Sequence, residues 1–217
     1  GYHPDAMVNF LVRLGWSHGD QEFFTRDELV EKFNLEHVGR SAGVFNPEKL
    51  LALNAEHIRA ASTPSLVPHL TPFLKEKGIA AEDGAYLHAV VDTLKPRSKT
   101  FIEMAEGAEF YFVEKPAYDE GAAAKFLTPD LLGAMRDLAG AVAGLADFDE
   151  KSLEDAFKRV MEAKALKFGK IAQPVRVALT GKTVSPGIFE MILVLGREKT
   201  LARLNDAIAY MEKKGRP

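Results

Sequence analysis

The sequence predicts an all-α protein. Signals that start and stop helices recur along the whole chain, and between them apolar residues repeat every three or four positions. The sequence has few runs in which β-branched and polar residues alternate, which is the pattern of a half-buried strand. With 217 residues and 47% hydrophobic content, the chain has enough apolar material for buried helical cores.

The first half of the chain carries clear helix starts. Thr25 and Glu28 form a capping box, and Asn46 precedes a proline at the first helical position. Helices are therefore expected over residues 4–14, 27–34, 48–61, 66–78, 84–95 and 100–108, the first closed by Gly15 and the fifth stopped by Pro96. The aromatic run FYFV at 110–113 fits either a short strand or a helix end.

A second helical block is expected from about residue 122. Capping residues at Thr128, Asp149 and Ser185 predict helices over 130–146, 150–166, 187–196 and 197–214. The periodicity breaks at STP, near residues 60–64, and at KPAYDEG, near residues 115–127. These breaks predict three parts, covering residues 1–62, 63–125 and 126–217.

Charge is unevenly distributed along the chain. The formal net charge is -3, yet residues 161–217 hold 11 Lys+Arg against 5 Asp+Glu. This excess of positive charge fits a surface that binds a polyanion, and it fits an ordinary solvated helix surface as well. There is no cysteine, which excludes disulfides, thiolate metal sites and cysteine nucleophiles. No apolar run reaches bilayer length and no signal peptide is recognisable, so we predict a cytoplasmic protein without a membrane segment.

Catalytic signals are absent from the sequence. The six histidines lie within the first 88 residues, but no two are spaced as metal ligands on one helix face. There is no Walker A motif, no GxGxxG between a strand and a helix, and no GxSxG elbow. We therefore expect neither a catalytic residue nor a metal site in this chain.

Four features could serve in binding. Trp16 fits a stacking platform for a base, or a core anchor after the first helix. Arg97 and Arg176 each follow a proline, so each is expected near a turn. Such a turn could direct the guanidinium outward to a base or a phosphate, or the arginine could be a surface residue without a ligand. The loop TGKTVSPGIF, with Lys182, could hold phosphate or a base edge at a helix start, or could be a simple helix cap.

Several motifs, taken in order, resemble one family. The opening GYHPDAMVNFLVRLGWSHGDQEFFTRDELVEKF and the stretch SAGVFNPEKLLALN resemble the region after the second class I signature of bacterial glutamyl-tRNA synthetases. Further on, LKPRSKTFIEM and KFGKIAQPVRVALTGKTVSPGIFEMILVLGREKTLARL are similar to the anticodon-binding half of the same family. The resemblance is collinear over essentially the whole chain.

This resemblance implies a fold of two successive helical-bundle domains, preceded by the helical end of the stem-contact region. It implies a C-terminal piece of a longer class I glutamate–tRNA ligase, which joins glutamate to tRNA(Glu) using ATP and Mg²⁺. The family's ATP-binding signatures, HIGH and KMSKS, lie before the position of Gly1, and neither occurs here. We therefore expect a monomeric, catalytically inactive piece without a cofactor of its own, whose partner is tRNA(Glu).

The resemblance also implies which residues contact the anticodon. Arg97 matches the family arginine that reads the third anticodon base and helps to exclude the glutamine anticodon. Arg176 matches a second anticodon-contacting arginine, and Ser185, Pro186 and Ile188 match the loop and helix start that contact the first two bases. An arginine at the Arg97 position implies a discriminating parent enzyme.

Other functional classes remain open at this point. Glutaminyl-tRNA synthetases do not fit, because they resemble this family in the catalytic half but bind the anticodon with β-barrels. A stand-alone helical adaptor without nucleic-acid binding is the alternative from another class, and it predicts no tRNA affinity. A catalytic chain in its own right is disfavoured by the missing phosphate-binding and nucleophile motifs.

Overall fold

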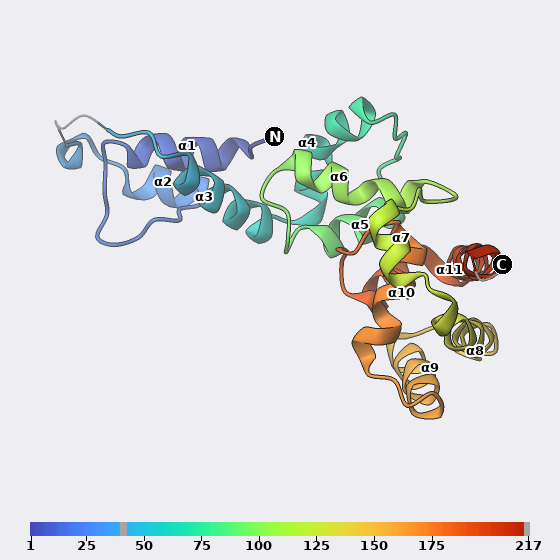
Figure 1. Ribbon diagram of the computed structural model, residues 1–217. Coiled ribbons are helices and arrows are strands. Elements are labelled where there is room, and N and C mark those ends of the chain that lie inside the picture. The colour runs from blue at the N-terminus through green and yellow to red at the C-terminus, as the bar shows by residue number, and fades with distance from the viewer. Residues whose placement is uncertain (40–42, 215–217) are drawn as a thin grey trace. The chain divides into compact units, whose positions relative to one another are not determined.

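The computed structural model describes residues 1–39 and 43–214, and these residues form helices and loops without a strand (Figure 1). The prediction of an all-α protein is confirmed. The α-helices are α1 (Pro4–Arg13), α2 (Arg26–Lys32), α3 (Pro47–Ala60), α4 (Thr63–Glu76), α5 (Ala85–Leu94), α6 (Phe101–Phe112), α7 (Glu120–Phe126), α8 (Leu132–Ala143), α9 (Glu150–Ala163), α10 (Phe168–Thr180) and α11 (Ile188–Lys214). Two short 3-10 helices, η1 and η2, cover Leu35–His37 and Pro129–Leu131.

The chain divides into two units, residues 1–108 and residues 109–217. The expected division at residues 62 and 125 stays a prediction. None of the described helices is both long enough and apolar enough to cross a bilayer.

Two helices were not predicted from the sequence, α7 and α10. The proline at position 174 was interpreted as a turn signal, but it lies inside α10. A proline in a helix interior costs about 3 kcal/mol, because it removes a hydrogen bond and crowds the preceding turn. Burial of the surrounding side chains offsets this cost, since most of the second half of α10 is buried.

Two further expectations agree with the structure. The FYFV segment is the end of α6 and its continuation, not a strand. The helices expected over 187–196 and 197–214 follow one another directly as α11, with a kink at Gly196, where φ is 78°. A left-handed residue of this kind is accessible to glycine at little cost, which explains the break at this position.

The predicted caps in the first unit are present. The Thr25 hydroxyl accepts from the Glu28 N–H at 3.2 Å, and a Glu28 carboxylate oxygen accepts from the Thr25 N–H at 2.8 Å. The bond from the Thr25 N–H to this carboxylate, and after it one from the Gln21 side chain, lowers the pKa of Glu28 to about 2. At α3, the Asn46 side chain accepts from two backbone N–H groups, at 3.0 and 3.1 Å. Local sequence therefore sets the starts of α2 and α3.

A buried polar layer connects the helices of the first unit. Asn54 accepts from the His3 N–H at 2.7 Å and donates to the Lys99 carbonyl at 2.5 Å. Asn9 accepts from the Phe24 N–H at 2.9 Å and donates to the Glu22 carbonyl, so its amide orientation is fixed. The His57 Nε2 lies 3.1 Å from the same Asn9 oxygen and must therefore donate to it.

This layer makes the stability of the first unit depend on pH. Burial is the main cause that lowers the pKa of His57 to about 4 and also lowers the pKa of His3. The unfolded chain then binds protons below pH 6.5 that the folded chain does not bind until about pH 4, so stability falls as the pH drops through this window.

We expect the free energy of unfolding to fall by about 2 kcal/mol between pH 7.5 and pH 5 from His57 alone. Urea titrations at the two pH values, followed by the fluorescence of Trp16, measure this change. A His57→Gln variant keeps a donor for Asn9 but cannot titrate, and it should lose most of the pH dependence. The exposed His37→Gln is the matched control, and an equal pH dependence in His57→Gln and the wild type would contradict the assignment.

A buried arginine organises the second unit. Arg203, on α11, is 1% exposed. Its guanidinium donates to the carbonyls of Phe110 (2.7 Å), Glu114 (3.2 Å), Leu179 (2.5 Å) and Val113. These carbonyls lie at the ends of α6 and α10, where helical carbonyls have no partner within their own helix. A single cation thus closes two helix ends.

Candidate nucleic-acid interface

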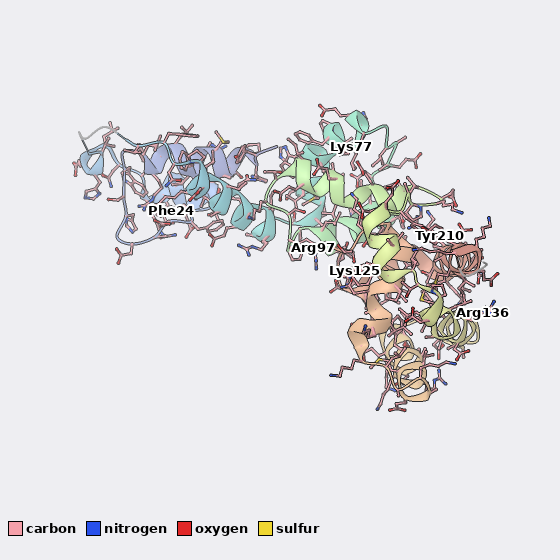
Figure 2. The ribbon with its side chains drawn as sticks, viewed as in Figure 1. Phe24, Lys77, Arg97, Lys125, Arg136 and Tyr210 are labelled. Carbon is pink, nitrogen blue, oxygen red and sulfur yellow. The ribbon has the colours of Figure 1, made fainter. Side chains whose placement is uncertain are left out.

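Arg97 lies in the turn that follows α5, at the position expected from the preceding proline (Figure 2). Its side chain is exposed, and its Nε donates to the Thr93 carbonyl at 3.3 Å. The neighbouring Ser98 is buried and donates through both its N–H and its hydroxyl to the Leu94 carbonyl. The end of α5 is therefore closed locally, and it presents the Arg97 guanidinium at the surface.

Arg176 lies elsewhere than expected, because it is inside α10 and not beside a turn. Its guanidinium crosses to the loop between α10 and α11, residues 181–187. There Nη1 donates to the Ser185 carbonyl at 3.3 Å, to the Pro186 carbonyl at 3.0 Å and to the Ser185 hydroxyl. The structure thus brings Arg176, Ser185 and Pro186 together, and it links the helix to the loop.

The first residues of this loop are fixed as well. Gly181 ends α10 with φ at 76°, and a Cβ there would overlap the Ala117 carbonyl oxygen. The Gly181 carbonyl accepts from the Asp119 N–H at 2.9 Å. The Thr180 hydroxyl accepts from the Lys182 N–H at 3.1 Å. Both ends of the loop are therefore held by hydrogen bonds to the helices around it.

The three residues of the loop and helix start that the resemblance assigns to base contacts are not the exposed ones. Pro186 is buried and Ile188 is only 5% exposed, while Ser185 is half-buried. The exposed side chains are those of Lys182, Thr183 and Val184. Sequence reasoning noted Lys182 but did not single out Val184, because exposure cannot be derived from a lone apolar residue in a loop.

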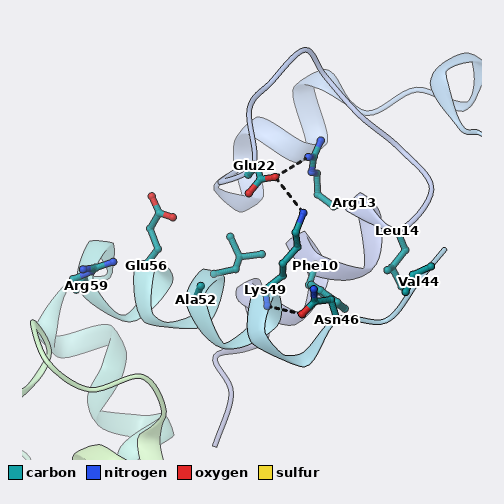
Figure 3. A pocket seen from close by; sticks show the side chains of 11 residues that line it. Phe10, Arg13, Leu14, Glu22, Val44, Asn46, Lys49, Ala52, Glu56 and Arg59 are labelled. Atoms are coloured by element: carbon teal, nitrogen blue, oxygen red, sulfur yellow. Dashed lines mark hydrogen bonds and ion pairs between the residues drawn. The ribbon is translucent and has the colours of Figure 1, made fainter.

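The first unit contains a cavity of about 390 Å³ between α1, α3 and the segments beside them (Figure 3). The Glu22 carboxylate lies between two of its cations, 3.5 Å from Arg13 and 3.8 Å from Lys49. Apolar side chains and further charged groups complete the lining: Phe10, Leu14, Val44, Asn46, Ala52, Leu53, Glu56 and Arg59. No sequence pattern predicted this cavity.

Trp16 and the histidines, the remaining candidates, do not form a binding site for a base or a metal ion among the described residues. Trp16 is 2% exposed and packs with Phe24 and Leu29, so it is a core anchor and not a stacking platform. His3 lies with its ring centre 6.0 Å from that of His57 and 5.3 Å from that of His69, although the three are far apart in sequence. Within the described residues, no group of three or more His, Cys, Asp or Glu side chains is arranged to hold a metal ion.

Comparison with known families decides what the arrangement belongs to. Residues 65–208 match the model of the anticodon binding domain. The chain belongs to the anticodon-binding domain family. All five residues predicted to contact an anticodon lie inside the matched segment. Residues 1–52 match a second model, the catalytic domain of class I tRNA synthetases for E and Q.

Curated relatives of this anticodon-binding chain include glutamate–tRNA ligases of several bacteria. The glutamate–tRNA ligase of Desulfosudis oleivorans is 59% identical over 98% of the chain, and that of Geobacter sulfurreducens is 51% identical over the same share. The chain spans 46% of the length of each. A solved glutamate tRNA ligase from Elizabethkingia meningosepticum superposes with a TM-score of 0.85 at 27% identity, covering 97% of this chain and 42% of that one. The expected resemblance to bacterial glutamyl-tRNA synthetases is confirmed.

Proposed function

We propose that this anticodon-binding chain is the tRNA-recognition portion of a glutamate–tRNA ligase, and that it binds tRNA(Glu) as a monomer in the cytoplasm. The observation that carries the proposal is the anticodon-binding match over residues 65–208, in a chain whose relatives are named glutamate–tRNA ligases. ATP and Mg²⁺ would serve the ligation reaction of the whole enzyme. This chain's own residues would bind and orient the tRNA.

Charge and geometry support this role. Residues 161–217 carry 11 Lys+Arg against 5 Asp+Glu, which suits a nucleic-acid partner. Arg97 is exposed at the end of α5 and can reach the edge of an unpaired base, where a guanidinium forms two parallel hydrogen bonds. In the proposal, Arg97 reads the third anticodon base, and the loop between α10 and α11 lies beside the first two bases.

The test is binding of the purified chain to labelled tRNA(Glu) and tRNA(Gln) at low salt. We expect tRNA(Glu) to bind more tightly, and we expect Arg97→Gln to reduce this preference by about 5- to 100-fold, the value of one bidentate arginine–base contact. Arg159→Gln, which removes the same charge from the exposed surface of α9, is the matched control and should leave the preference intact.

Two outcomes would count against the proposal. Undiminished discrimination by Arg97→Gln would remove Arg97 from base reading. Absence of binding to either tRNA, at salt concentrations where electrostatic contacts are strong, would favour a helical adaptor without a nucleic-acid role.

A further inference from the structure

The loop between α10 and α11 presents an apolar side chain to solvent. Val184 is 79% exposed, which makes it the most exposed large apolar side chain among the described residues of the second unit. It contributes almost nothing to the core, so nearly all of its apolar surface is available to a ligand. Lys182 and Thr183, the two residues before it, are exposed too.

Hydrogen bonds hold both ends of this loop. Arg176 holds the carbonyls of Ser185 and Pro186 from one side, and the Thr180 hydroxyl holds the Lys182 N–H from the other. Gly181 is fixed against the Ala117 carbonyl. A ligand that contacts Val184 therefore need not order the loop, which removes one of the main costs of binding.

One cationic side chain lies beside the exposed valine at the tip of the loop. Lys182 has no ion-pair partner within the described part of the chain, and its ammonium is exposed. The Glu190 carboxylate lies against Gly187, at the end of the loop away from Lys182, and the Asp119 backbone contacts the loop at Gly181. Two residues of extended chain span at most about 7 Å, so an apolar contact and a cation stand side by side.

We propose that Val184 and Lys182 together hold one unpaired nucleotide of an RNA loop. Val184 packs against the face of the base, and Lys182 pairs with the adjoining phosphate. Arg176 is a positioning residue, because its guanidinium donates to the Ser185 and Pro186 carbonyls in the loop that carries the contact. Buried Pro186 and Ile188 support the loop from within. This inference rests on the proposed function and adds contact residues that the resemblance does not supply.

The test uses a short RNA hairpin whose loop carries the glutamate anticodon, and its binding is measured by fluorescence anisotropy at several salt concentrations. We expect Val184→Ser to weaken binding about fivefold or more without changing the salt dependence. Lys182→Gln should weaken binding and reduce the slope of log K against log salt by about 1. Matched controls are Val30→Ser, at a valine 77% exposed on α2, and Lys213→Gln near the end of α11.

A double-mutant cycle tests the positioning role of Arg176. If Arg176 acts through the loop, Arg176→Gln should weaken binding, and adding Val184→Ser to it should cost little more. Additive losses would overturn that role and make Arg176 an independent contact. Thermal unfolding of each variant verifies that the fold is intact.

The outcomes separate this inference from the function on which it rests. If the wild-type chain binds the hairpin and Arg97→Gln loses discrimination, while Val184→Ser and Lys182→Gln bind like the wild type, the nucleotide contact is overturned and the proposed function stands. If the wild-type chain binds neither the hairpin nor tRNA, the proposed function fails with it.

Discussion

Replacing Arg203 by methionine should destabilise the second unit by about 3–5 kcal/mol, a large part of the stability of a domain of this size. The side chain is 1% exposed and donates to four backbone carbonyls. Methionine has a similar shape but no donors, so these carbonyls would stay buried without their partner. Urea unfolding followed by circular dichroism measures the loss.

Arg136→Met is the matched control for this experiment. Arg136 lies on α8 in the same unit (Figure 2). It is more than half exposed and pairs with Glu212 at 2.7 Å. An exposed ion pair contributes at most about 1 kcal/mol. Hydrogen exchange resolved by peptide should place the Arg203→Met loss in residues 109–214. Equal stability of the two variants would show that Arg203 does not hold the ends of α6 and α10.

Replacing Gly181 by alanine should cost about 3–5 kcal/mol, through left-handed backbone strain and a steric overlap together. The residue has φ at 76°, and an added Cβ would meet the Ala117 carbonyl oxygen, a backbone atom that cannot rotate away. Because Gly181 also begins the loop that Arg176 holds, RNA binding through this loop should weaken in the same variant. Thermal unfolding and hairpin binding measure the two effects.

Gly140→Ala is the opposite case. Gly140 lies within α8, and nothing lies within 4 Å of an added Cβ. Alanine there should stabilise the protein by about 0.5–1 kcal/mol, because glycine is a poor helix former. A Gly181→Ala protein that unfolds at the same temperature as Gly140→Ala would contradict the conformation assigned to residue 181.

What could be predicted from the sequence was local. The capping box at Thr25 and Glu28 and the cap at Asn46 depend on residues two or three positions apart, and both are present. Pro174 was misinterpreted because its local penalty is outweighed by packing against distant segments. The exposed turn of Arg97 followed from one preceding proline.

Local sequence patterns could not predict the hydrogen bonds of Arg176. Its guanidinium reaches residues nine and ten positions later in the chain, across the end of a helix that was not predicted. Arg203 shows the same limit, since nothing in ARLN distinguishes a buried arginine from a surface one. The resemblance supplied candidate positions, but exposure of Val184 and burial of Ile188 depend on tertiary packing.

The hydrogen bond from Arg203 to the Phe110 carbonyl spans 93 residues of sequence, almost the length of the second unit. During synthesis, the end of α6 leaves the ribosome long before its partner, at a rate of roughly 5–20 residues per second. At that rate, we expect its carbonyls to stay hydrated for several seconds until α11 emerges. We therefore expect the second unit to complete its folding late, in one step that waits for α11, and to be the part most exposed to chaperones while the chain is made.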